Sequence, residues 1–278
     1  MKNNFAYFIA SYGKPEYIPT YEALKDRGAE YPIYIVVGYD DPKLTMYINK
    51  YEDNLYIFDK TNYLDKVDAI GVYNKTHKIC TYSRLAVNDY ADELGYKYVG
   101  YLFDDIKSFD MRYVNKEGKI SATKNFKIDR FMDMYIDLLN SSDDIYIVGP
   151  PASSFYIGVN KSKSRDYCSR FGNMFVYDID KQLEPYRASM MEDMTIVLDN
   201  NSRGKLSICP FGLQVQCREP ATTKDSYGGM TLSEYIQQKS IMCGGVEIGK
   251  SIPQIPYKNF IPKIIAEKYK TKKTNKLF

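Results

Sequence analysis

The sequence contains no tryptophan and only one histidine, His77. A single histidine cannot supply the multi-histidine ligand sets of catalytic zinc sites, and it permits a Ser-His-Asp triad only if His77 is itself the base. His77 lies in a polar, lysine-containing stretch that is typical of a protein surface. Catalysis must therefore depend on carboxylates, lysine, arginine, tyrosine or a hard metal ion.

Cysteine is scarce and irregularly placed. The five cysteines are odd in number and never form a CxxC pair. This pattern speaks against a disulfide framework and a cysteine-based zinc site, and it indicates reduced, core-forming thiols. No segment approaches the roughly 20 apolar residues that cross a bilayer. The apolar run 5–10 is too short for a signal peptide. We therefore expect a cytoplasmic protein with no membrane partner.

Several sequence motifs of nucleotide-binding and hydrolytic enzymes are also absent. The sequence has no GxGxxG after its first apolar run, no Walker A motif and no nucleophile elbow. These absences argue against a Rossmann dehydrogenase, a P-loop NTPase and an α/β-hydrolase. The composition is that of an ordinary globular protein, because 44% of the 278 residues are hydrophobic and 26% are charged.

The first half of the sequence alternates apolar runs with helical patterns. We expect strands at residues 5–10, 34–37, 54–58, 98–103 and 145–148, and helices at 18–27, 44–51, 81–94 and 131–139. Such a series predicts an α/β fold whose mostly parallel sheet is flanked by helices. Ligands of these sheets bind at the carboxyl ends of the strands, which predicts one crevice formed by residues 10–14, 38–41 and 104–105.

The second half is less regular. A short helix is expected at 192–198 and strands at 206–208 and 213–215. The last 21 residues, 258–278, carry seven lysines and one acidic residue. This basic tail is suited to phosphates or nucleic acid, or it is a solvated, frayed terminus.

The acidic pair Asp104-Asp105 is the strongest local feature. It directly follows the apolar run 98–103, where two like charges repel each other unless a cation lies between them. Carboxylates are hard oxygen ligands that suit Mg²⁺ or Mn²⁺. Such an ion would neutralise a leaving diphosphate. The alternative interpretation is a solvated acidic turn.

Two further groups could carry chemistry. Glu192-Asp193 begins a predicted helix, where acidic residues stabilise the N-terminus, and it could also supply a general base. Arg84 and Asn88 are four residues apart on one helical face and could meet a phosphate or a base. Otherwise they form a surface pair.

These features resemble the GT-A glycosyltransferases. Residues 8–15 resemble the strand and loop that hold the nucleotide, residues 34–38 the second strand, and residues 102–106 the DxD stretch. Arg84 and Asn88 fall on the helix before it, and Glu192-Asp193 resembles the ED motif that often supplies the catalytic base. The resemblance covers roughly residues 5–215 in the expected order.

More narrowly, the sequence resembles the phage-type TET-associated glycosyltransferases, which are thought to glycosylate hydroxymethylated pyrimidines in DNA. The run Asp104-Asp105-Ile106, followed by Phe109 and Arg112, carries this likeness. Two features depart from the pattern. Phe103 stands where a full DDD has an aspartate, and no histidine follows His77 as a metal ligand. Asp105 is therefore the principal expected metal ligand.

The resemblance implies a metal-dependent transferase with an Mn²⁺ or Mg²⁺ cofactor and a UDP-sugar as donor. Asp104 and Asp105 would hold the metal, and Glu192 and Asp193 would be catalytic. The nucleotide sugar would contact Ala10, Ser11, Tyr12, Gly13, Lys14, Arg84, Asn88 and Asp104.

For the acceptor, the lysine-rich end favours modified DNA, with contacts from Lys250, Lys258 and Lys263. A target base would have to leave the stack. We expect one GT-A-like domain over residues 1–257, with a Rossmann-like nucleotide-sugar half, 1–150, and an acceptor half, 151–257. If the chain is phage-encoded, it would act in the host cytoplasm. The alternatives are a surface glycan or protein as acceptor, and a non-catalytic nucleic-acid-binding protein of the same fold.

Overall fold

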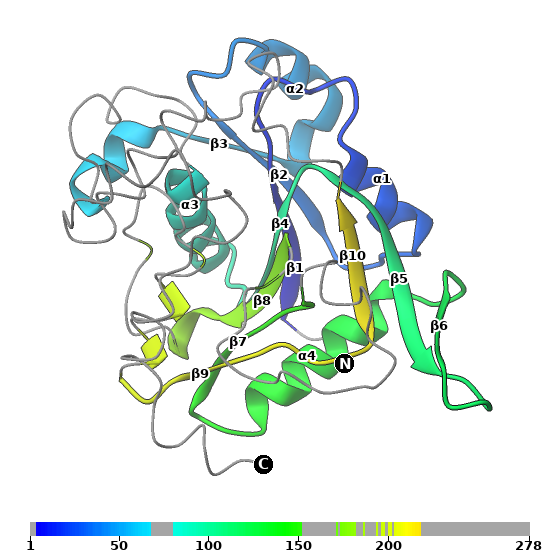
Figure 1. Ribbon diagram of the computed structural model, residues 1–278. Coiled ribbons are helices and arrows are strands. Elements are labelled where there is room, and N and C mark those ends of the chain that lie inside the picture. Colours follow the sequence, from blue (N-terminus) through cyan, green and yellow to red (C-terminus); the bar gives the residue numbers. More distant parts are fainter. Residues whose placement is uncertain are drawn as a thin grey trace, which may run out of the picture.

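The computed structural model describes residues 4–67, 80–151, 173–181 and 203–217, together with the single or paired positions 171, 186, 193, 196–197 and 200–201. Its centre is a seven-stranded sheet in the order β3-β2-β1-β4-β8-β7-β9 (Figure 1). The strands are β1 (Phe5–Ala10), β2 (Ile33–Gly38), β3 (Leu55–Phe58), β4 (Tyr98–Phe103), β7 (Ile145–Val148), β8 (Met174–Asp178) and β9 (Leu206–Ile208).

Most neighbouring strands of this sheet run in parallel. β1 pairs in parallel with β2 and β4, and β2 with β3, whereas β8 runs antiparallel to β4 and β7. β7 and β9 are again parallel. The carboxyl ends of β1, β2 and β4 therefore meet at one edge, and the amino end of β8 lies at the same edge. The predicted fold class, a mostly parallel sheet flanked by helices with a Rossmann-like first half, is confirmed.

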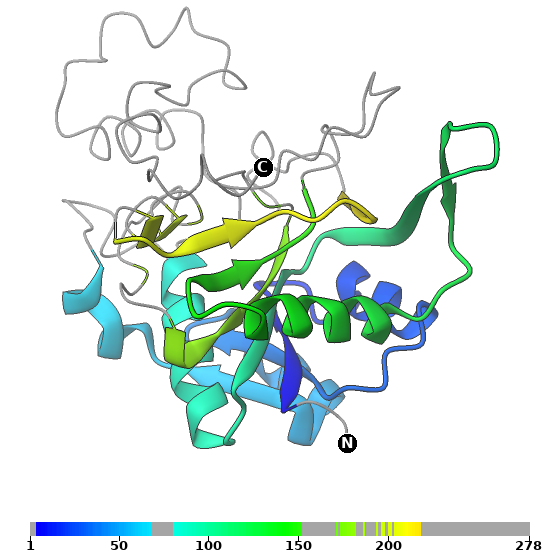
Figure 2. The ribbon, with the colours of Figure 1, turned by 90° about the horizontal axis from the view of Figure 1, so that it is seen from below.

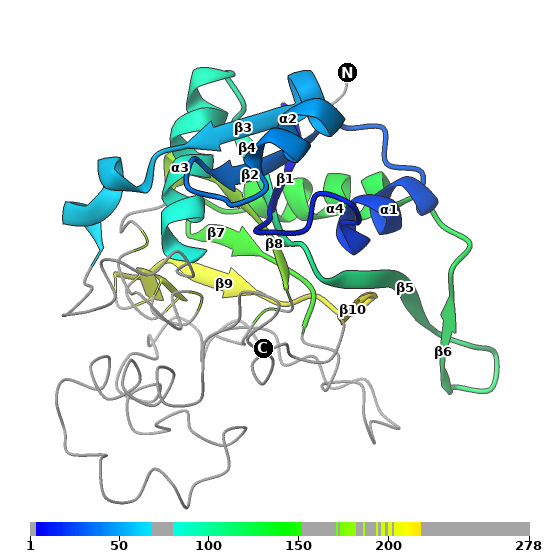
Figure 3. The ribbon, with the colours of Figure 1, turned by 90° about the horizontal axis from the view of Figure 1, so that it is seen from above.

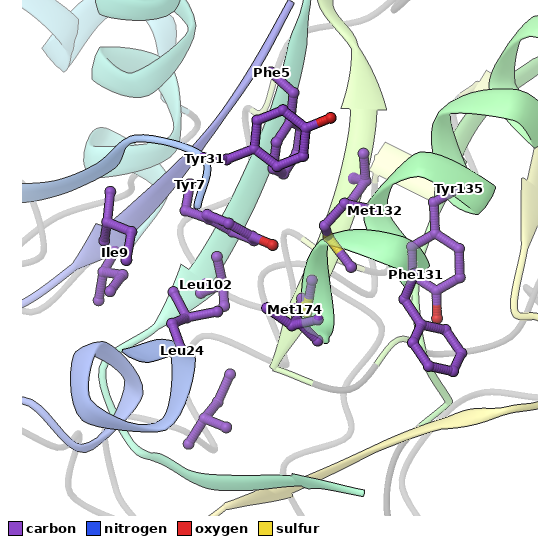
Figure 4. Close-up of a cluster of buried hydrophobic side chains, with 14 of the residues drawn as sticks. Phe5, Tyr7, Ile9, Leu24, Tyr31, Leu102, Phe131, Met132, Tyr135 and Met174 are labelled. Carbon is purple, nitrogen blue, oxygen red and sulfur yellow. The ribbon is translucent and has the colours of Figure 1, made fainter. Parts of the chain in front are cut away.

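Alternate residues of β1 point into two separate cores. Phe5, Tyr7 and Ile9 belong to one cluster of buried side chains, and Ala6 and Phe8 belong to another. A strand that is covered on both faces has no polar side, which explains its continuous apolar sequence. Figure 4 shows how the first cluster fills the space between the sheet and its helices.

Among the described residues, four helices with defined bounds cover the sheet. α1 (Pro19–Asp26), α2 (Leu44–Tyr51) and α4 (Ile128–Asn140) contribute to the first cluster, and α3 (Cys80–Glu93) contributes to the second. Figure 3 shows α3 and α4 on different sides of the sheet. The described residues also contain short 3-10 turns, η1 (Glu52–Asn54), η2 (Lys60–Lys66) and η5 (Ile179–Lys181). Within these residues, no helix combines the length and the apolar character that crossing a membrane requires.

A second, antiparallel sheet has the order β10-β5-β6. Its strands are β5 (Ile106–Val114), β6 (Ile120–Thr123) and β10 (Leu213–Cys217). β5 begins immediately after Asp104-Asp105, and α1 packs against it. The far ends of β5 and β6 project from the body of the molecule (Figure 2).

Some expected elements differ from the structure. β5, β6 and β8 were not predicted, and α4 begins at Ile128, three residues before the expected start. The expected strands at 206–208 and 213–215 are present as β9 and β10. Of the expected helix 192–198, positions 193, 196 and 197 are described, and all three are helical. The division into a domain of residues 1–257 and a basic tail stays a prediction.

Candidate active site

The charged residues at the carboxyl edge of β1 and β4 form a compact cluster. Lys14 Nζ lies 3.1 Å from Asp104 Oδ1 and 3.2 Å from Asp104 Oδ2. The side chains are only 27% and 14% exposed, so this ion pair is partly shielded from water. Ser11 Oγ donates a hydrogen bond of 3.1 Å to Asp104 Oδ2. The predicted meeting of the β1 loop with Asp104 is therefore found in the structure.

Tyr47 on α2 holds this loop in place through hydrogen bonds. Its side chain is fully buried, and its hydroxyl lies 2.8 Å from Ser11 Oγ and 2.9 Å from the Lys14 backbone nitrogen. Burial raises the Tyr47 pKa well above the ordinary value, so the hydroxyl keeps its proton. The Ser11 proton goes to Asp104, and Lys14 N–H donates to Tyr47. Tyr47 must therefore donate to Ser11, which gives a directed chain of hydrogen bonds that ends on Asp104.

Asp41 holds the glycine of the same loop. Its Oδ2 accepts from Gly13 N at 2.7 Å, and its Oδ1 accepts from Lys43 N at 2.8 Å. Gly13 has a φ of +68°, a conformation that a residue with a Cβ adopts only at a cost. The buried Asp41 carboxylate thus links the turn after β1 to the segment after β2.

The rest of the segment after β2 faces the same edge. Tyr39 is 69% exposed, and Asp40 pairs with Lys60 Nζ at 2.5 Å. Tyr12 is half-buried, and its pKa is raised by burial and by the charges of Asp41 and Asp40. The predicted proximity of residues 10–14 and 38–41 is found in the structure.

Thr20 on α1 fixes the turn that carries the two aspartates. Its hydroxyl donates to the Phe103 carbonyl at 2.5 Å and accepts from Ile106 N at 2.9 Å. One buried threonine thus spans the residues on either side of Asp104-Asp105. Both carboxylates therefore project from a turn that is held on each side.

Asp105 lies in a different environment from Asp104. Its Oδ1 accepts a 2.9 Å hydrogen bond from Asn173 Nδ2. Burial raises the Asp105 pKa, and the neighbouring Asp104 charge adds to this effect, whereas the Asn173 hydrogen bond and Lys14 oppose it. Cys217 at the end of β10 belongs to the same surroundings. Burial and the Asp105 charge raise the pKa of its thiol to about 12, so it stays a neutral thiol.

The donor atoms suit a hard divalent cation. Magnesium is commonly held by one or two carboxylates, with substrate phosphates and waters as the other ligands. Asp104 and Asp105 provide such a pair, and the described residues contain no cluster of three or more acidic, cysteine or histidine side chains. Asp104 is already engaged by Lys14 and Ser11, so Asp105 fits the cation first.

The structure encloses Arg84 in the core. Its side chain is fully buried, and its guanidinium carbon lies 4.8 to 5.3 Å from the centres of four aromatic rings. These rings belong to Tyr101, Phe103, Phe175 and Tyr186. The surface-pair alternative is wrong for Arg84, because the rings cover the face of α3 that carries it. A role for Arg84 in nucleotide binding stays a prediction, and it requires an opening of this aromatic enclosure.

Asn88 lies deeper along the sheet than the charged cluster. Its side-chain oxygen accepts a hydrogen bond from the Tyr177 hydroxyl. Tyr177 pairs with Val99, near the amino end of β4, whereas Asp104 follows the carboxyl end. The structure therefore does not bring Asn88 together with the residues around Asp104, and its predicted nucleotide contact is unsupported by position.

Of the remaining predicted residues, only some lie in the part of the chain that the structure describes. Asp193 is helical and half-buried. Glu192 and the three predicted DNA-binding lysines, Lys250, Lys258 and Lys263, lie outside the described residues, as does His77. Their roles stay predictions.

Replacing Tyr47 with phenylalanine tests how the loop is positioned. The variant leaves the partly buried Lys14 N–H without its acceptor, so we expect a loss of about 1 kcal/mol in the free energy of unfolding. A loosened loop should also raise the donor KM about ten-fold. Urea unfolding and donor kinetics measure both effects.

Tyr51→Phe is the matched control, because Tyr51 lies one turn later on α2 and its hydroxyl makes only a 3.5 Å contact with Pro15 O. It should leave the donor KM unchanged. Equal effects of the two substitutions on stability and on the donor KM would show that the hydroxyl of Tyr47 does not position the loop and that only the packing of its ring matters.

A mostly parallel α/β sheet with charged loops at its carboxyl edge belongs to the class of α/β folds whose ligands bind at that edge. The model of the TET-associated glycosyltransferases matches residues 5–215, and the chain belongs to this family. It is therefore a glycosyltransferase. No curated protein sequence matches the chain.

Solved structures of other transferases are similar over most of the chain. A structure of S. aureus TarS with UDP-GlcNAc is 12% identical with a TM-score of 0.47, and the match covers 89% of this chain and 67% of that one. TarS with UDP is 11% identical with a TM-score of 0.44 and 66% of its chain covered. An active-site mutant of LgtC is 10% identical, with a TM-score of 0.37, 85% of this chain covered and 95% of that one. The chain thus spans about two thirds of the TarS structures.

Proposed function

We propose that the chain transfers a sugar from a nucleotide sugar, most simply a UDP-sugar, to the hydroxyl of a hydroxymethylated pyrimidine in DNA. The observation that carries the donor half is the cluster of Lys14, Ser11 and Asp104 at the carboxyl edge of the sheet. A partly shielded ammonium beside a hydroxyl is a suitable partner for a diphosphate. Family membership supports the acceptor.

In this proposal Lys14 exchanges its carboxylate partner for the donor diphosphate. The ammonium then stabilises negative charge on the leaving nucleoside diphosphate, where such stabilisation lowers the barrier most. Ser11 and Gly13 shape the loop that receives the phosphates, and Tyr12 and Ala10 border it. Tyr47 and Asp41 hold the loop so that little reorganisation is needed during the reaction.

Asp105 and then Asp104 would hold Mn²⁺ or Mg²⁺. A bound divalent ion neutralises charge on the diphosphate as the bond to the sugar breaks. Asn173 orients the Asp105 carboxylate for this task through its 2.9 Å hydrogen bond. Asp193 or Glu192 is proposed to accept the proton of the acceptor hydroxyl.

The proposed acceptor is DNA. Lys250, Lys258 and Lys263 are proposed to contact its phosphates, and the modified base would be turned out of the duplex to reach the site. Action in a phage-infected host cytoplasm is part of the same proposal.

The test is a panel of nucleotide sugars incubated with the protein, with Mn²⁺ and with hydroxymethylated DNA, in which release of nucleoside diphosphate is measured. One donor should be consumed, and unmodified DNA should not support its transfer. Turnover with glycans or proteins but never with DNA would replace the acceptor. No turnover of any donor with any acceptor would contradict the proposal and favour a non-catalytic nucleic-acid-binding protein.

A further inference from the structure

The segment that follows the two aspartates is strongly basic. Residues 107–127, here named the basic hairpin, contain six cationic side chains: Lys107, Arg112, Lys116, Lys119, Lys124 and Lys127. They contain two acidic residues, Asp110 and Glu117. All five lysines are exposed, whereas Asp110 is buried and accepts a hydrogen bond from Gln216. The exposed charge of the basic hairpin is therefore almost entirely positive.

Few carboxylates neutralise these lysines. Lys119 pairs with Glu117 and Lys127 pairs with Glu30, both between highly exposed side chains. Such exposed pairs are weak and exchange easily for another anion. Among the described residues, Lys107, Lys116 and Lys124 have no carboxylate within ion-pair distance.

The basic hairpin has a defined shape. β5 has nine residues, and at about 3.4 Å per residue it extends about 30 Å, close to one helical turn of duplex DNA. Its base is held by pairing with β10, and its outer part pairs with β6 from Met111↔Thr123 to Val114↔Ile120. Figure 2 shows this outer part clear of the body of the protein.

The tip of the basic hairpin is an ordered turn. The Asn115 side-chain oxygen accepts from Glu117 N at 3.0 Å and from Lys119 N at 2.9 Å. Gly118 supplies the positive φ of +73° that the turn needs. The backbone that carries Lys116 and Lys119 is thus ordered, which lowers the backbone entropy lost when the lysines bind an anion.

Protection of an edge strand is the competing explanation for these lysines, because charges on an edge strand prevent pairing with other chains. Lysine is well suited to that role. The role leaves unexplained, however, the apolar side chains exposed among the lysines, since Tyr113 is 42% exposed and Val114 is 53% exposed. Positive charges beside an exposed aromatic side chain instead fit a polyanion that also offers apolar surface.

We propose that the basic hairpin contacts the phosphate backbone of the DNA acceptor. This inference rests on the proposed function, and it adds to that function a position for the duplex on the protein. The duplex lies along β5 and β6, and its reacting base lies at the Asp104-Asp105 end, because β5 begins directly after these residues. Lysines near both ends of a segment about 30 Å long would fix the register of the duplex relative to the site.

The double substitution Lys116→Gln with Lys124→Gln tests this proposal without changing the Asp104-Asp105 region. Each phosphate contact contributes about 0.9 to the slope of log affinity against log salt. The variant should therefore bind duplex DNA at least about ten-fold more weakly at 0.1 M salt, with a slope that is shallower by about 1.8. Fluorescence anisotropy of a labelled duplex over a salt series measures both quantities.

The control is Lys66→Gln with Lys205→Gln, which removes the same charge. Lys66 lies on η2, the cyan turn opposite the basic hairpin in Figures 2 and 3, and Lys205 directly precedes β9. This control should bind duplex DNA as the unmodified protein does. Donor hydrolysis, measured without DNA, should be the same in all three proteins.

Two results would overturn the inference. One is equal affinity and slope for the hairpin variant and the control. The other is an unmodified protein that hydrolyses a donor but shows no salt-dependent binding to duplex DNA. Failure of the proposed function looks different, because no donor would then be consumed while the hairpin variant could still lose DNA binding.

Discussion

Asp105→Asn is expected to lower kcat/KM for sugar transfer by about 100-fold or more, because an amide is a much weaker ligand for a divalent cation than a carboxylate. Loss of such a cation removes several kcal/mol of transition-state stabilisation. The asparagine oxygen can still accept the hydrogen bond that Asn173 donates to Asp105. The local structure should therefore persist. The measurement is transfer rate against Mn²⁺ concentration.

The pH dependence of stability gives a second measurement on the same variant. Because burial raises the pKa of Asp105, its stabilising contribution is fully present below the ordinary aspartate pKa and is lost as pH rises through the raised value. Asparagine has no charge to bury. The variant should therefore be at least as stable as the unmodified protein at pH 7, and this advantage should shrink as pH falls toward 4. An inactive variant that is also unfolded at pH 7 would contradict this account of Asp105.

Lys14→Met is expected to lower kcat/KM about 100- to 1000-fold, the range seen when one donor to a developing negative charge is removed. Methionine retains much of the length of the side chain but has no ammonium group. It also leaves Asp104, only 14% exposed, without its cationic partner. Donor KM and kcat should be measured separately, since loss of a diphosphate contact that tightens in the transition state lowers kcat.

Lys14→Arg is the matched control, because it keeps the positive charge beside Asp104. It should recover a substantial part of the activity that methionine removes. If arginine and methionine reduce kcat/KM equally while both proteins fold, charge at this position is unimportant and the proposed exchange of Lys14 onto the diphosphate is wrong.

The fold and the meeting of the β1 loop with the aspartate pair could be predicted because they depend on local patterns. Each apolar run, such as 5–10 and 98–103, forms a buried parallel strand, and parallel strands place their carboxyl ends at one edge. The β1 loop and the aspartate pair therefore meet although about 90 residues separate them. The family resemblance gave the transferase activity.

Particular contacts could not be predicted, because they depend on how elements pack. Nothing in the spacing of α2 shows that the Tyr47 hydroxyl reaches Ser11 and Lys14 N, or that Asn173 before β8 reaches Asp105. Arg84 was predicted to contact the nucleotide or, as the alternative, to form a surface pair, but rings from β4, β8 and Tyr186 enclose it. Burial of a guanidinium follows from tertiary packing alone.

The basic hairpin did carry a signal in its sequence. Phe109, Met111 and Tyr113 alternate with polar residues, which is the pattern of a strand with one buried face. The five lysines of the same segment also indicate a basic surface directly after the aspartate pair.

The most direct test of the account is the mass of nucleosides from hydroxymethylated duplex DNA after incubation with the protein, Mn²⁺ and a set of nucleotide sugars. The account predicts that one donor adds a single sugar mass to the hydroxymethylated nucleoside, and that Asp105→Asn reduces this product about 100-fold. Hydrolysis of a donor by the unmodified protein, with no sugar on the DNA under any of these conditions, would contradict it.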